Sequence, residues 1–346
     1  MILKKLPQNI IISRTDNLGD VVVTLPLAGY IKSVVPDSKV YFVGKSYTRM
    51  VIEASNYVDQ FIDKQDVLHN PMILGDLNAD AIIFALPDKA VAQAATKAAI
   101  PIRIGTGHKV YHWLYCNRRV NFSRRKSDLH EAQLNFKLLQ AFDIDTEPSF
   151  QEIATWYGLT LNDTNNDFSK WLSDEKFNLI VHPKSKGSAK EWGVENYAHL
   201  VAQLPAKDFN VLITGIKEEG DLLKEQVPEL FTHAHVQDLT GALSLEQLLS
   251  LINKVDGFLA GSTGPLHIAA ALGKFTLGIY PPIRPMHPGR WQPIGKNAHY
   301  ITLDKMCSDC RKSESCACVK SITIAQVKSK LVEFAQHHQQ SLGNNS

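Results

Sequence analysis

The sequence has no marked excess of charge of either sign. It holds 37 lysines and arginines against 35 aspartates and glutamates in 346 residues, so no overall positive field points to a nucleic acid partner. No run is long and apolar enough to span a bilayer, and residues 1–7 lack the extended apolar region of a secretory signal. These absences predict a globular protein of the cytoplasm.

Cysteine is scarce, and its placement argues against a disulfide framework. The chain has five cysteines, an odd number, and one short stretch holds four of them: Cys307, Cys310, Cys316 and Cys318. Reduced thiols are typical of a cytoplasmic protein. Four thiolates are also a ligand set for Zn²⁺, although the final Cys-x-Cys spacing is tighter than in a zinc ribbon. The sequence leaves a structural cluster and a metal site both open.

Apolar strand-like runs alternate with amphipathic helix-like runs, which indicates parallel sheets covered by helices. In the first half we expect strands at 9–14, 40–43, 61–62, 81–85 and 102–104, and helices at 20–35, 89–99 and 129–142. In the second half we expect strands at 177–182, 211–214, 257–260 and 275–280, and helices at 194–204, 218–226, 245–255, 268–272 and 324–338. Two doubly wound halves of similar size follow from this pattern.

The length and one polar stretch predict how the chain divides into domains. A chain of 346 residues is too long for one typical core. Residues 143–174 are polar and irregular and are interpreted as a linker, with a strand near 153–159. We therefore expect one domain over 1–160, a second over 175–325, and a terminal helix over 326–346 that crosses back onto the first. Ligands of such folds bind at the carboxyl ends of the strands.

The segment 261–267, Gly-Ser-Thr-Gly-Pro-Leu-His, joins a strand-like run to a helix of small residues. A strand that enters a glycine-bounded turn and then a helix aims backbone N–H groups at an anion, most often a phosphate. Ser262 and Thr263 add hydroxyl donors, and Pro265 suits the first helical position. An ordinary capped helix gives the same pattern, so the turn alone leaves both interpretations open.

A second strand-to-helix turn, residues 13–20, ends in Gly19 and Asp20. An aspartate there is ionised at neutral pH and is competent as a proton acceptor. A helix-capping aspartate without further function is the alternative. Pro26, inside the expected helix, predicts a local distortion close to Asp20.

Four motifs, taken in order, resemble glycosyltransferase family nine, the ADP-heptose:lipopolysaccharide heptosyltransferases. They are Asn-Leu-Gly-Asp-Val-Val-Val-Thr-Leu-Pro at 17–26, His-Glu-Ala-Gln-Leu-Asn at 130–135, His-Pro-Lys-Ser at 182–185 with Lys-Glu-Trp at 190–192, and the 261–267 turn. Each motif is degenerate, but the ordered set spans nearly the whole chain.

The resemblance implies an α/β protein of the GT-B fold, with two doubly wound Rossmann-like domains that face a central cleft. Domain 1–160 would bind the acceptor and domain 175–325 the nucleotide sugar. It implies a glycosyltransferase that moves a sugar, a heptose from ADP-heptose, from a nucleotide-diphosphate donor to the lipopolysaccharide core or another cell-surface saccharide. Transfer would be a single displacement with inversion, with Asp20 matching the family's general base and no cofactor required.

The donor-binding residues that the resemblance implies lie in the second half of the chain. They are Lys184, Ser185, Lys190, Glu219, Ser262, Thr263, Gly264 and His267. Lys190 matches a lysine that contacts the donor diphosphate, and Glu219 falls near an acidic residue that binds the ribose. Ser262 departs from the family, because several members carry an aspartate there in contact with the heptose. The identity of the transferred sugar therefore stays open.

A basic stretch in the first half is a candidate acceptor site. Residues 118–126 hold five positive charges: Arg118, Arg119, Arg124, Arg125 and Lys126. We expect them to receive an anionic acceptor, such as a phosphorylated or acidic lipid-linked saccharide, or the inner membrane surface. His130 is a further candidate acceptor contact. A solvated loop, and a capping or packing role for His130, are the alternatives, and a single aromatic residue, Phe122, is too few to favour nucleic acid.

Two further observations complete the prediction. Asp143-Ile144-Asp145 has the Asp-x-Asp form of metal-dependent transferases, but it lies in the expected linker and is interpreted as turn residues. Two other functions stay open from the sequence: a nucleotide-sugar epimerase, which acts without an acceptor, and a non-catalytic nucleotide-sugar-binding protein of the same fold. The expected location is the cytoplasm, with peripheral contact at the cytoplasmic face of the inner membrane.

Overall fold

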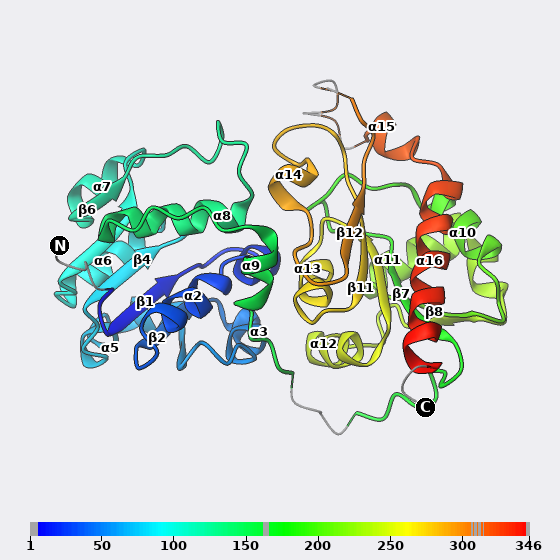
Figure 1. Ribbon diagram of the computed structural model, residues 1–346, viewed down its shortest axis with the longest axis horizontal. Helices are drawn as coiled ribbons and strands as arrows, with labels where there is room; N and C mark the ends of the chain where they lie inside the picture. The colour runs from blue at the N-terminus through cyan, green and yellow to red at the C-terminus, as the bar shows by residue number, and fades with distance from the viewer. Residues whose placement is uncertain are drawn as a thin grey trace. The chain divides into compact units, whose positions relative to one another are not determined.

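The computed structural model describes residues 6–161, 166–305, 307, 310, 313 and 315–343. The chain divides into two compact units, Met1–Thr160 and Leu161–Ser346. Each unit is built on one six-stranded parallel sheet covered by helices (Figure 1). No helix within the described ranges is both long and apolar enough to cross a membrane.

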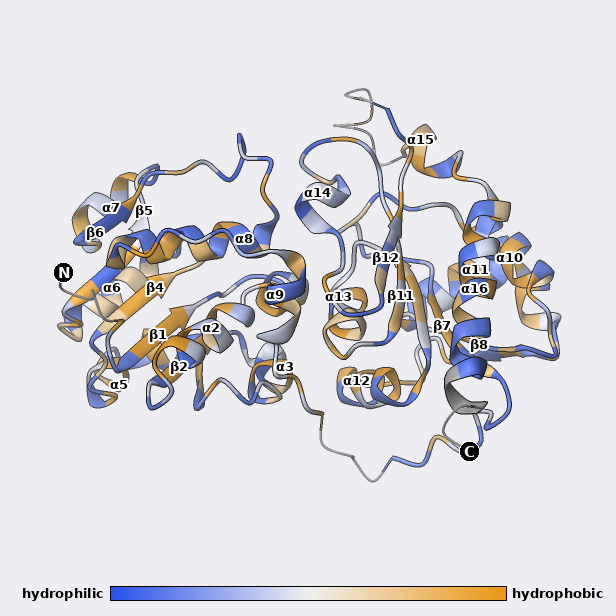
Figure 2. Ribbon diagram, viewed as in Figure 1, coloured by the Kyte–Doolittle hydropathy of each residue, from blue (hydrophilic) through white to orange (hydrophobic). Residues whose placement is uncertain are grey.

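The sheet of the first unit has the strand order β3-β2-β1-β4-β5-β6. The strands are β1 (Asn9–Ser13), β2 (Lys39–Gly44), β3 (Gln60–Asp63), β4 (Ala81–Phe84), β5 (Ile102–Thr106) and β6 (Arg118–Val120). The central strand β4 is apolar throughout, and β1 has three consecutive isoleucines between Asn9 and Ser13 (Figure 2). Strands buried on both faces need this composition, which is why the sequence predicted them.

Helices cover both faces of this sheet. They are α1 (Leu18–Val22), α2 (Pro26–Val34), α3 (Arg49–Glu53), α4 (Lys64–His69), α5 (Met72–Asp76), α6 (Lys89–Lys97), α7 (Val110–Tyr115), α8 (Glu131–Phe136) and α9 (Phe150–Thr155), with 3₁₀ turns η1 (Ser46–Thr48) and η2 (Lys137–Phe142). Helices α4, α5 and α6 share one core with β1, β2 and β4. Helices α2, α8 and α9 pack together over the opposite face (Figure 1).

The sheet of the second unit has the order β12-β11-β10-β7-β8-β9, which repeats the order of the first sheet. Its strands are β7 (Phe177–His182), β8 (Phe209–Ile213), β9 (Val236–Asp238), β10 (Gly257–Gly261), β11 (Phe275–Ile279) and β12 (Ala298–Ile301). Its helices are α10 (Val194–Gln203), α11 (Lys217–Gln226), η3 (Pro228–Thr232), α12 (Leu245–Lys254), α13 (Gly264–Ala271), α14 (Pro288–Trp291), α15 (Ala317–Lys320) and α16 (Ile324–Gly343).

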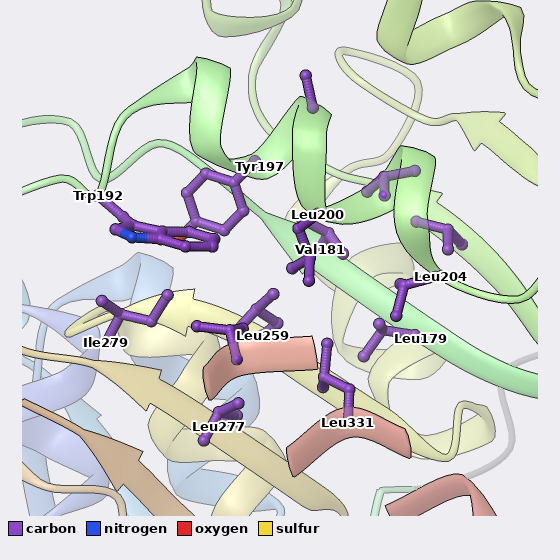
Figure 3. Packing of buried hydrophobic residues seen from close by; sticks show 14 of the residues in the cluster. Leu179, Val181, Trp192, Tyr197, Leu200, Leu204, Leu259, Leu277, Ile279 and Leu331 are labelled. Atoms are coloured by element: carbon purple, nitrogen blue, oxygen red, sulfur yellow. The ribbon is translucent and has the colours of Figure 1, made fainter. Parts of the chain in front are cut away.

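The main core of the second unit lies between its sheet and helices α10, α11 and α16, while α12 and α13 cover the other face (Figure 1). Trp192 and Tyr197 pack edge to face over leucine and valine side chains of β7 and β10 (Figure 3). The indole Nε1 of Trp192 donates to the Ile322 carbonyl at 2.8 Å. A buried indole needs such a partner, so Trp192 anchors the core.

Three expected elements differ in the structure. Pro26 divides the helix expected over 20–35 into α1 and α2, because proline cannot donate to the preceding turn but suits the start of a new helix. The helix expected over 129–142 continues beyond α8 only as the 3₁₀ turn η2. The strand expected near 153–159 is wrong: Ser149 and Glu152 form a capping box that starts α9, and Leu159 makes only an isolated bridge with Ser55.

The terminal helix was expected to cross back onto the first domain. In the structure its apolar face, with Val327, Leu331, Phe334 and Ala335, is buried in the core of the second unit. Amphipathic spacing predicted that this helix must pack, but it carries no information about which sheet it covers.

Candidate functional site

Each sheet reverses its strand order at one point, and polar residues collect at both points. In the first unit the reversal lies between β1 and β4, and in the second between β7 and β10. Loops that leave neighbouring strands in opposite directions open a crevice at their carboxyl ends, where ligands of doubly wound sheets bind. The segments that follow β1 and β10 contain Asp20 and the 261–267 turn.

Asp20 lies in the first turn of α1 and is held by Arg14, which follows β1 directly. The Arg14 guanidinium donates to a carboxylate oxygen of Asp20 and, through Nε, to Asp16 Oδ1 at 2.8 Å. Its Nη1 donates to Glu131 Oε1 at 2.9 Å. One buried cation therefore orients three carboxylates.

A second arginine completes this network. Arg124 donates to the same Glu131 oxygen as Arg14, to the Ala85 carbonyl at 2.8 Å and to Asn135 Oδ1 at 3.0 Å. Glu131 is only 2% exposed, and a buried carboxylate is tolerated when cations and hydrogen bonds surround it. The sequence predicted Arg124 as an acceptor contact. In the structure its guanidinium donates to groups of the first unit itself.

The surroundings of Asp20 raise the pKa of its carboxyl to about 6. Burial is the largest cause, Arg14 opposes it, and the nearby charges of Asp16 and Glu131 add to it. At pH 7 the carboxylate is still mainly ionised, and its basicity lies closer to the operating pH than that of an ordinary aspartate. These are the properties of an effective general base.

The 261–267 turn has the expected strand-to-helix form. Strand β10 ends at Gly261, Thr263 takes an extended conformation at the N-cap, and α13 begins at Gly264 with Pro265 in its first turn. The Thr263 side chain makes no capping hydrogen bond. The positive end of α13, eight residues long, is thus not neutralised by its own cap.

Two buried polar atoms in this turn have no partner among the described residues. They are the Thr263 hydroxyl and Nδ1 of His267, and the two residues are 5% and 3% exposed. An unsatisfied buried polar group is costly, so it usually marks a place where a ligand or water binds. Burial lowers the pKa of His267 to about 4, so its imidazole is neutral at pH 7.

The loop after β7 lies beside this turn. The Ser188 hydroxyl reaches the Ser262 carbonyl at 3.5 Å, and a Cβ on Gly261 would lie 3.4 Å from the Cβ of Ala189. Glu191 holds the loop: it pairs with Lys184 Nζ at 2.5 Å and accepts from both N and Oγ of Ser185 at 3.1 Å. The structure therefore brings the predicted residues of 184–190 and 262–267 together.

Lys190 is buried in the same loop, and its ammonium donates to the carbonyl of Ser313. Ser313 belongs to the segment that carries the four clustered cysteines. A carbonyl carries no negative charge, so this hydrogen bond leaves the ammonium available to compensate the charge of an anion nearby. This contact between Lys190 and the cysteine segment could not be predicted from the sequence.

Glu219 and Ser262 have partners within the second unit. Glu219 Oε2 accepts from the backbone N–H of Ile216 at 3.0 Å and so caps α11 at the carboxyl end of β8. Ser262 interacts with the hydroxyl of Tyr280, a fully buried residue that also donates to the Trp291 carbonyl at 2.5 Å. Tyr280 beside the turn was missed by the sequence analysis, since it looks like one more apolar residue that ends a strand.

The other predicted acceptor residues differ from one another in exposure and in hydrogen-bond partners. Arg118 and Arg119 lie in β6, at the edge of the first sheet, and bond to the carbonyls of Ala141 and Cys116. Arg125 is exposed. His130 is fully buried and accepts from the Ala132 N–H at 3.1 Å as the cap of α8. Its burial contradicts the predicted contact with an acceptor and agrees with the capping alternative.

The clustered cysteines are all free thiols. They associate in pairs: Cys318 lies 3.7 Å from Cys307 between sulfur atoms, and Cys316 is hydrogen-bonded to Cys310. Within the described part of the chain, no group of three or more cysteine, histidine or acidic side chains is arranged to hold a metal ion. The two inner thiols, Cys316 and Cys318, pack in the main core of the second unit.

Comparisons with known proteins agree with this geometry. A family model described as glycosyltransferase family 9 (heptosyltransferase) matches residues 74–319. The lipopolysaccharide core heptosyltransferase OpsX of Haemophilus influenzae is 25% identical over 313 residues, which cover 87% of this chain and 84% of the relative.

Solved structures of Escherichia coli proteins share the fold. The ADP-heptose lipopolysaccharide heptosyltransferase II superposes with a TM-score of 0.72 and 19% identity over 96% of this chain and 100% of that one. Heptosyltransferase WaaC with ADP gives 0.69 and 18% over 94% and 99%. The predicted GT-B fold is thereby confirmed, and the chain belongs to glycosyltransferase family 9, the heptosyltransferase family.

Proposed function

We propose that this glycosyltransferase moves a heptose from ADP-heptose to a saccharide of the lipopolysaccharide core or a similar cell-surface glycan, with inversion at the anomeric carbon. The related proteins are named for this donor and this acceptor class. The second unit would bind the nucleotide sugar, and the first would bind the acceptor and carry the base.

The turn at 261–267 carries this proposal. It offers a helix start without a side-chain cap, a buried hydroxyl and a buried imidazole nitrogen that lack partners, and a buried lysine in the adjacent loop. A diphosphate would satisfy these groups together, because it supplies many acceptor oxygens and negative charge. His267 is neutral, so Lys190 would provide most of the compensating charge, with Lys184 nearby in the same loop.

In the proposed reaction, Asp20 removes the proton from the acceptor hydroxyl. The resulting oxygen nucleophile attacks the anomeric carbon of the donor while the bond from that carbon to the diphosphate breaks, and ADP leaves with the bonding electrons. One displacement inverts the configuration of that carbon. Arg14 orients Asp20, and the 261–267 turn with Lys190 stabilises the charge that develops on the leaving diphosphate.

We further propose that transfer needs no metal ion, since side chains and the α13 N-terminus already offer positive charge to the diphosphate. The expected result is that the rate with donor and acceptor is unchanged after dialysis against a chelator. Loss of activity on chelation and recovery with Mg²⁺ or Mn²⁺ would contradict this point, while leaving the assignment of the donor in place.

Arg118, Arg119 and Arg125 remain the proposed contacts for the anionic groups of the acceptor. All three lie in a segment of the first unit that holds no acidic residue. A cytoplasmic location with peripheral contact at the inner membrane stays part of the proposal, and the five free thiols are compatible with a reducing compartment.

A ligand panel tests the function directly. A ligand that binds the folded state raises the melting temperature, so we expect ADP and ADP-heptose to raise it while UDP- and GDP-sugars leave it unchanged. Product analysis with donor alone and with donor plus lipopolysaccharide core acceptor then separates the alternatives. A new sugar nucleotide from donor alone indicates an epimerase, and binding without release of ADP in either mixture indicates a non-catalytic protein.

A further inference from the structure

Helix α7 exposes an apolar face. Among the large hydrophobic side chains of the described residues, the three with the greatest exposure all belong to this six-residue helix: Val110 at 82%, Leu114 at 72% and Trp113 at 63%. Positions i, i+3 and i+4 share one side of a helix, so the three form one surface. We call Val110, Trp113 and Leu114 the α7 triad.

The opposite side of α7 is firmly anchored. His112 is fully buried and its Nδ1 lies 2.9 Å from the Thr106 carbonyl oxygen, and the Tyr115 hydroxyl accepts from Gln93 of α6 at 2.8 Å. The helix therefore cannot roll to hide the triad without breaking these contacts. Trp113 is also fixed, because its Nε1 donates to the Gly107 carbonyl and the Arg119 guanidinium lies 4.2 Å from its ring centre.

The chain segment that carries the triad is rich in positive charge, and the acidic residue near α7, Asp88, is itself paired with Lys64. No aspartate or glutamate occurs between Asp88 and Asp128, although the whole chain is nearly balanced. The same stretch holds nine lysines and arginines: Lys89, Lys97, Arg103, Lys109, Arg118, Arg119, Arg124, Arg125 and Lys126. It forms α6, β5, α7 and β6, which together make one edge of the first unit (Figure 2).

We propose that this edge docks on the surface of an anionic lipid bilayer, with the α7 triad inserted at the level of the headgroups and Lys109, Arg118 and Arg119 against the lipid phosphates. Apolar residues with an amphipathic tryptophan and flanking cations are the combination that binds such an interface. The inference rests on the proposed function in one respect: an acceptor carried on lipid would place the reaction at this surface.

A second copy of the chain is a poorer occupant of this face. A symmetric contact would bring the exposed cations Lys109, Arg118 and Arg119 of two copies together. Three side chains also provide far less than the roughly 1,200 Å² that a stable protein interface buries. A bilayer offers negative charge and an apolar interior to the same face at once.

Cosedimentation of the full chain with vesicles tests the proposal. We expect binding to phosphatidylcholine vesicles that contain phosphatidylglycerol and little binding to phosphatidylcholine alone. Trp113→Ser with Leu114→Ser should lower the partition coefficient on anionic vesicles at least tenfold, and Lys109→Glu should lower it by roughly tenfold. Met72→Ser removes another exposed apolar side chain, 52% exposed on α5, and should change nothing.

Two further measurements keep the outcome interpretable. Light scattering reports the oligomeric state. A wild-type protein that is dimeric and a Trp113/Leu114 variant that is monomeric would assign this face to a second copy of the chain. Transfer to a lipid-free saccharide and the melting-temperature response to ADP should be unchanged in that variant. The docking proposal would be overturned if the wild-type protein did not bind anionic vesicles, or if the Trp113/Leu114 variant bound them equally well. If ADP did not raise the melting temperature of the wild type, the proposed function would be overturned instead.

Discussion

The two units have the same strand order, but they differ in how the buried polar groups are satisfied at the point where the strand order reverses. In the first unit the buried groups are fully charged and paired with one another: Arg14 and Arg124 with Asp16, Asp20 and Glu131. In the second unit Thr263 and His267 are buried and uncharged, and each leaves an atom without a partner among the described residues. The buried cation beside them, Lys190, is hydrogen-bonded to a neutral carbonyl and not to a carboxylate. Ion pairs within the unit therefore dominate the first arrangement, whereas the second offers donors that a ligand can satisfy.

This difference separates two physical tasks. A network of paired charges fixes the orientation and basicity of one carboxylate before any substrate arrives, which suits proton transfer. Unpaired donors at a helix start stay available for a ligand whose charge changes during the reaction. Removal of a fully paired group such as Glu131 should therefore weaken folding of the first unit, whereas removal of an unpaired donor in the second unit should weaken ligand binding.

Asp20→Asn should have the largest effect on transfer. Loss of a general base typically costs roughly 10²- to 10⁴-fold in rate, and we expect that loss in the initial rate with donor and acceptor. The folded protein should not be destabilised, since burial already disfavours the ionised form of Asp20. The melting-temperature response to ADP should also persist, because the proposed diphosphate site at residues 261–267 belongs to the other unit. A rate close to that of the wild type would remove Asp20 from the mechanism.

Glu131→Gln should have the largest effect on stability. The substitution leaves the Arg14 and Arg124 guanidiniums without their shared buried carboxylate, and removal of one partner of a buried ion pair costs about 3–5 kcal/mol. Urea unfolding followed by a probe in the first unit measures it. The matched control is Glu53→Gln, which breaks an exposed pair with Arg49 and should change the free energy of unfolding little. Equal effects from both would show that the network does not stabilise the unit.

Thr263→Val should separate ligand binding from stability in the second unit. It removes a buried hydroxyl that has no partner, so the ligand-free protein should gain about 1 kcal/mol, while ADP affinity should fall roughly five- to twentyfold. Calorimetric titration and thermal unfolding measure the two quantities. Thr276→Val removes another unpartnered buried hydroxyl, at the opposite end of the sheet, and should stabilise without any loss of ADP affinity. Unchanged affinity in Thr263→Val would contradict the proposed diphosphate site.

The smallest effects concern the pH dependence of transfer. Protonation of Asp20 removes the base, so kcat/KM should fall about tenfold per unit below pH 6. Arg14 lowers the pKa of Asp20, so Arg14→Lys, which cannot hold three carboxylates, should move this acid limb to higher pH by roughly one unit. Asp16 raises the pKa of Asp20, so Asp16→Asn should move the limb to lower pH. Shifts in the same direction would exclude Asp20 as the titrating group.

The sequence predicted the central strands because they are continuous apolar runs, and it predicted the edge strand β3, but it missed the edge strands β6, β9 and β12. Strand β6 consists of Arg118, Arg119 and Val120, and its composition favours a basic loop until a neighbouring strand is present to pair with it. Helix α9 was predicted as a strand although Ser149 and Glu152 have the spacing of a capping box. That signal was in the sequence and was overlooked.

The sites of the two units also differ in how far they could be predicted from the sequence. The 261–267 turn is contiguous in the chain, so its residue types made an anion site one of two interpretations, beside an ordinary capped helix. The contact between Arg14 and Glu131 joins residues 117 positions apart, and no local pattern shows that a charge after an apolar strand will meet that partner. The contact between Lys190 and Ser313 spans 123 positions and was equally invisible.

Because Arg14 is hydrogen-bonded to three carboxylates, its network also limits which amino-acid replacements this chain can accept in evolution. Replacement of Arg14 alone removes the shared cation of three carboxylates, and replacement of Glu131 alone removes the shared carboxylate of two arginines. Either single replacement leaves buried charges without their partners and should destabilise the first unit. Among homologues we therefore expect positions 14, 16, 124 and 131 to be inherited as a set, exchanged together or not at all, while positions on the outer face of the same unit drift independently.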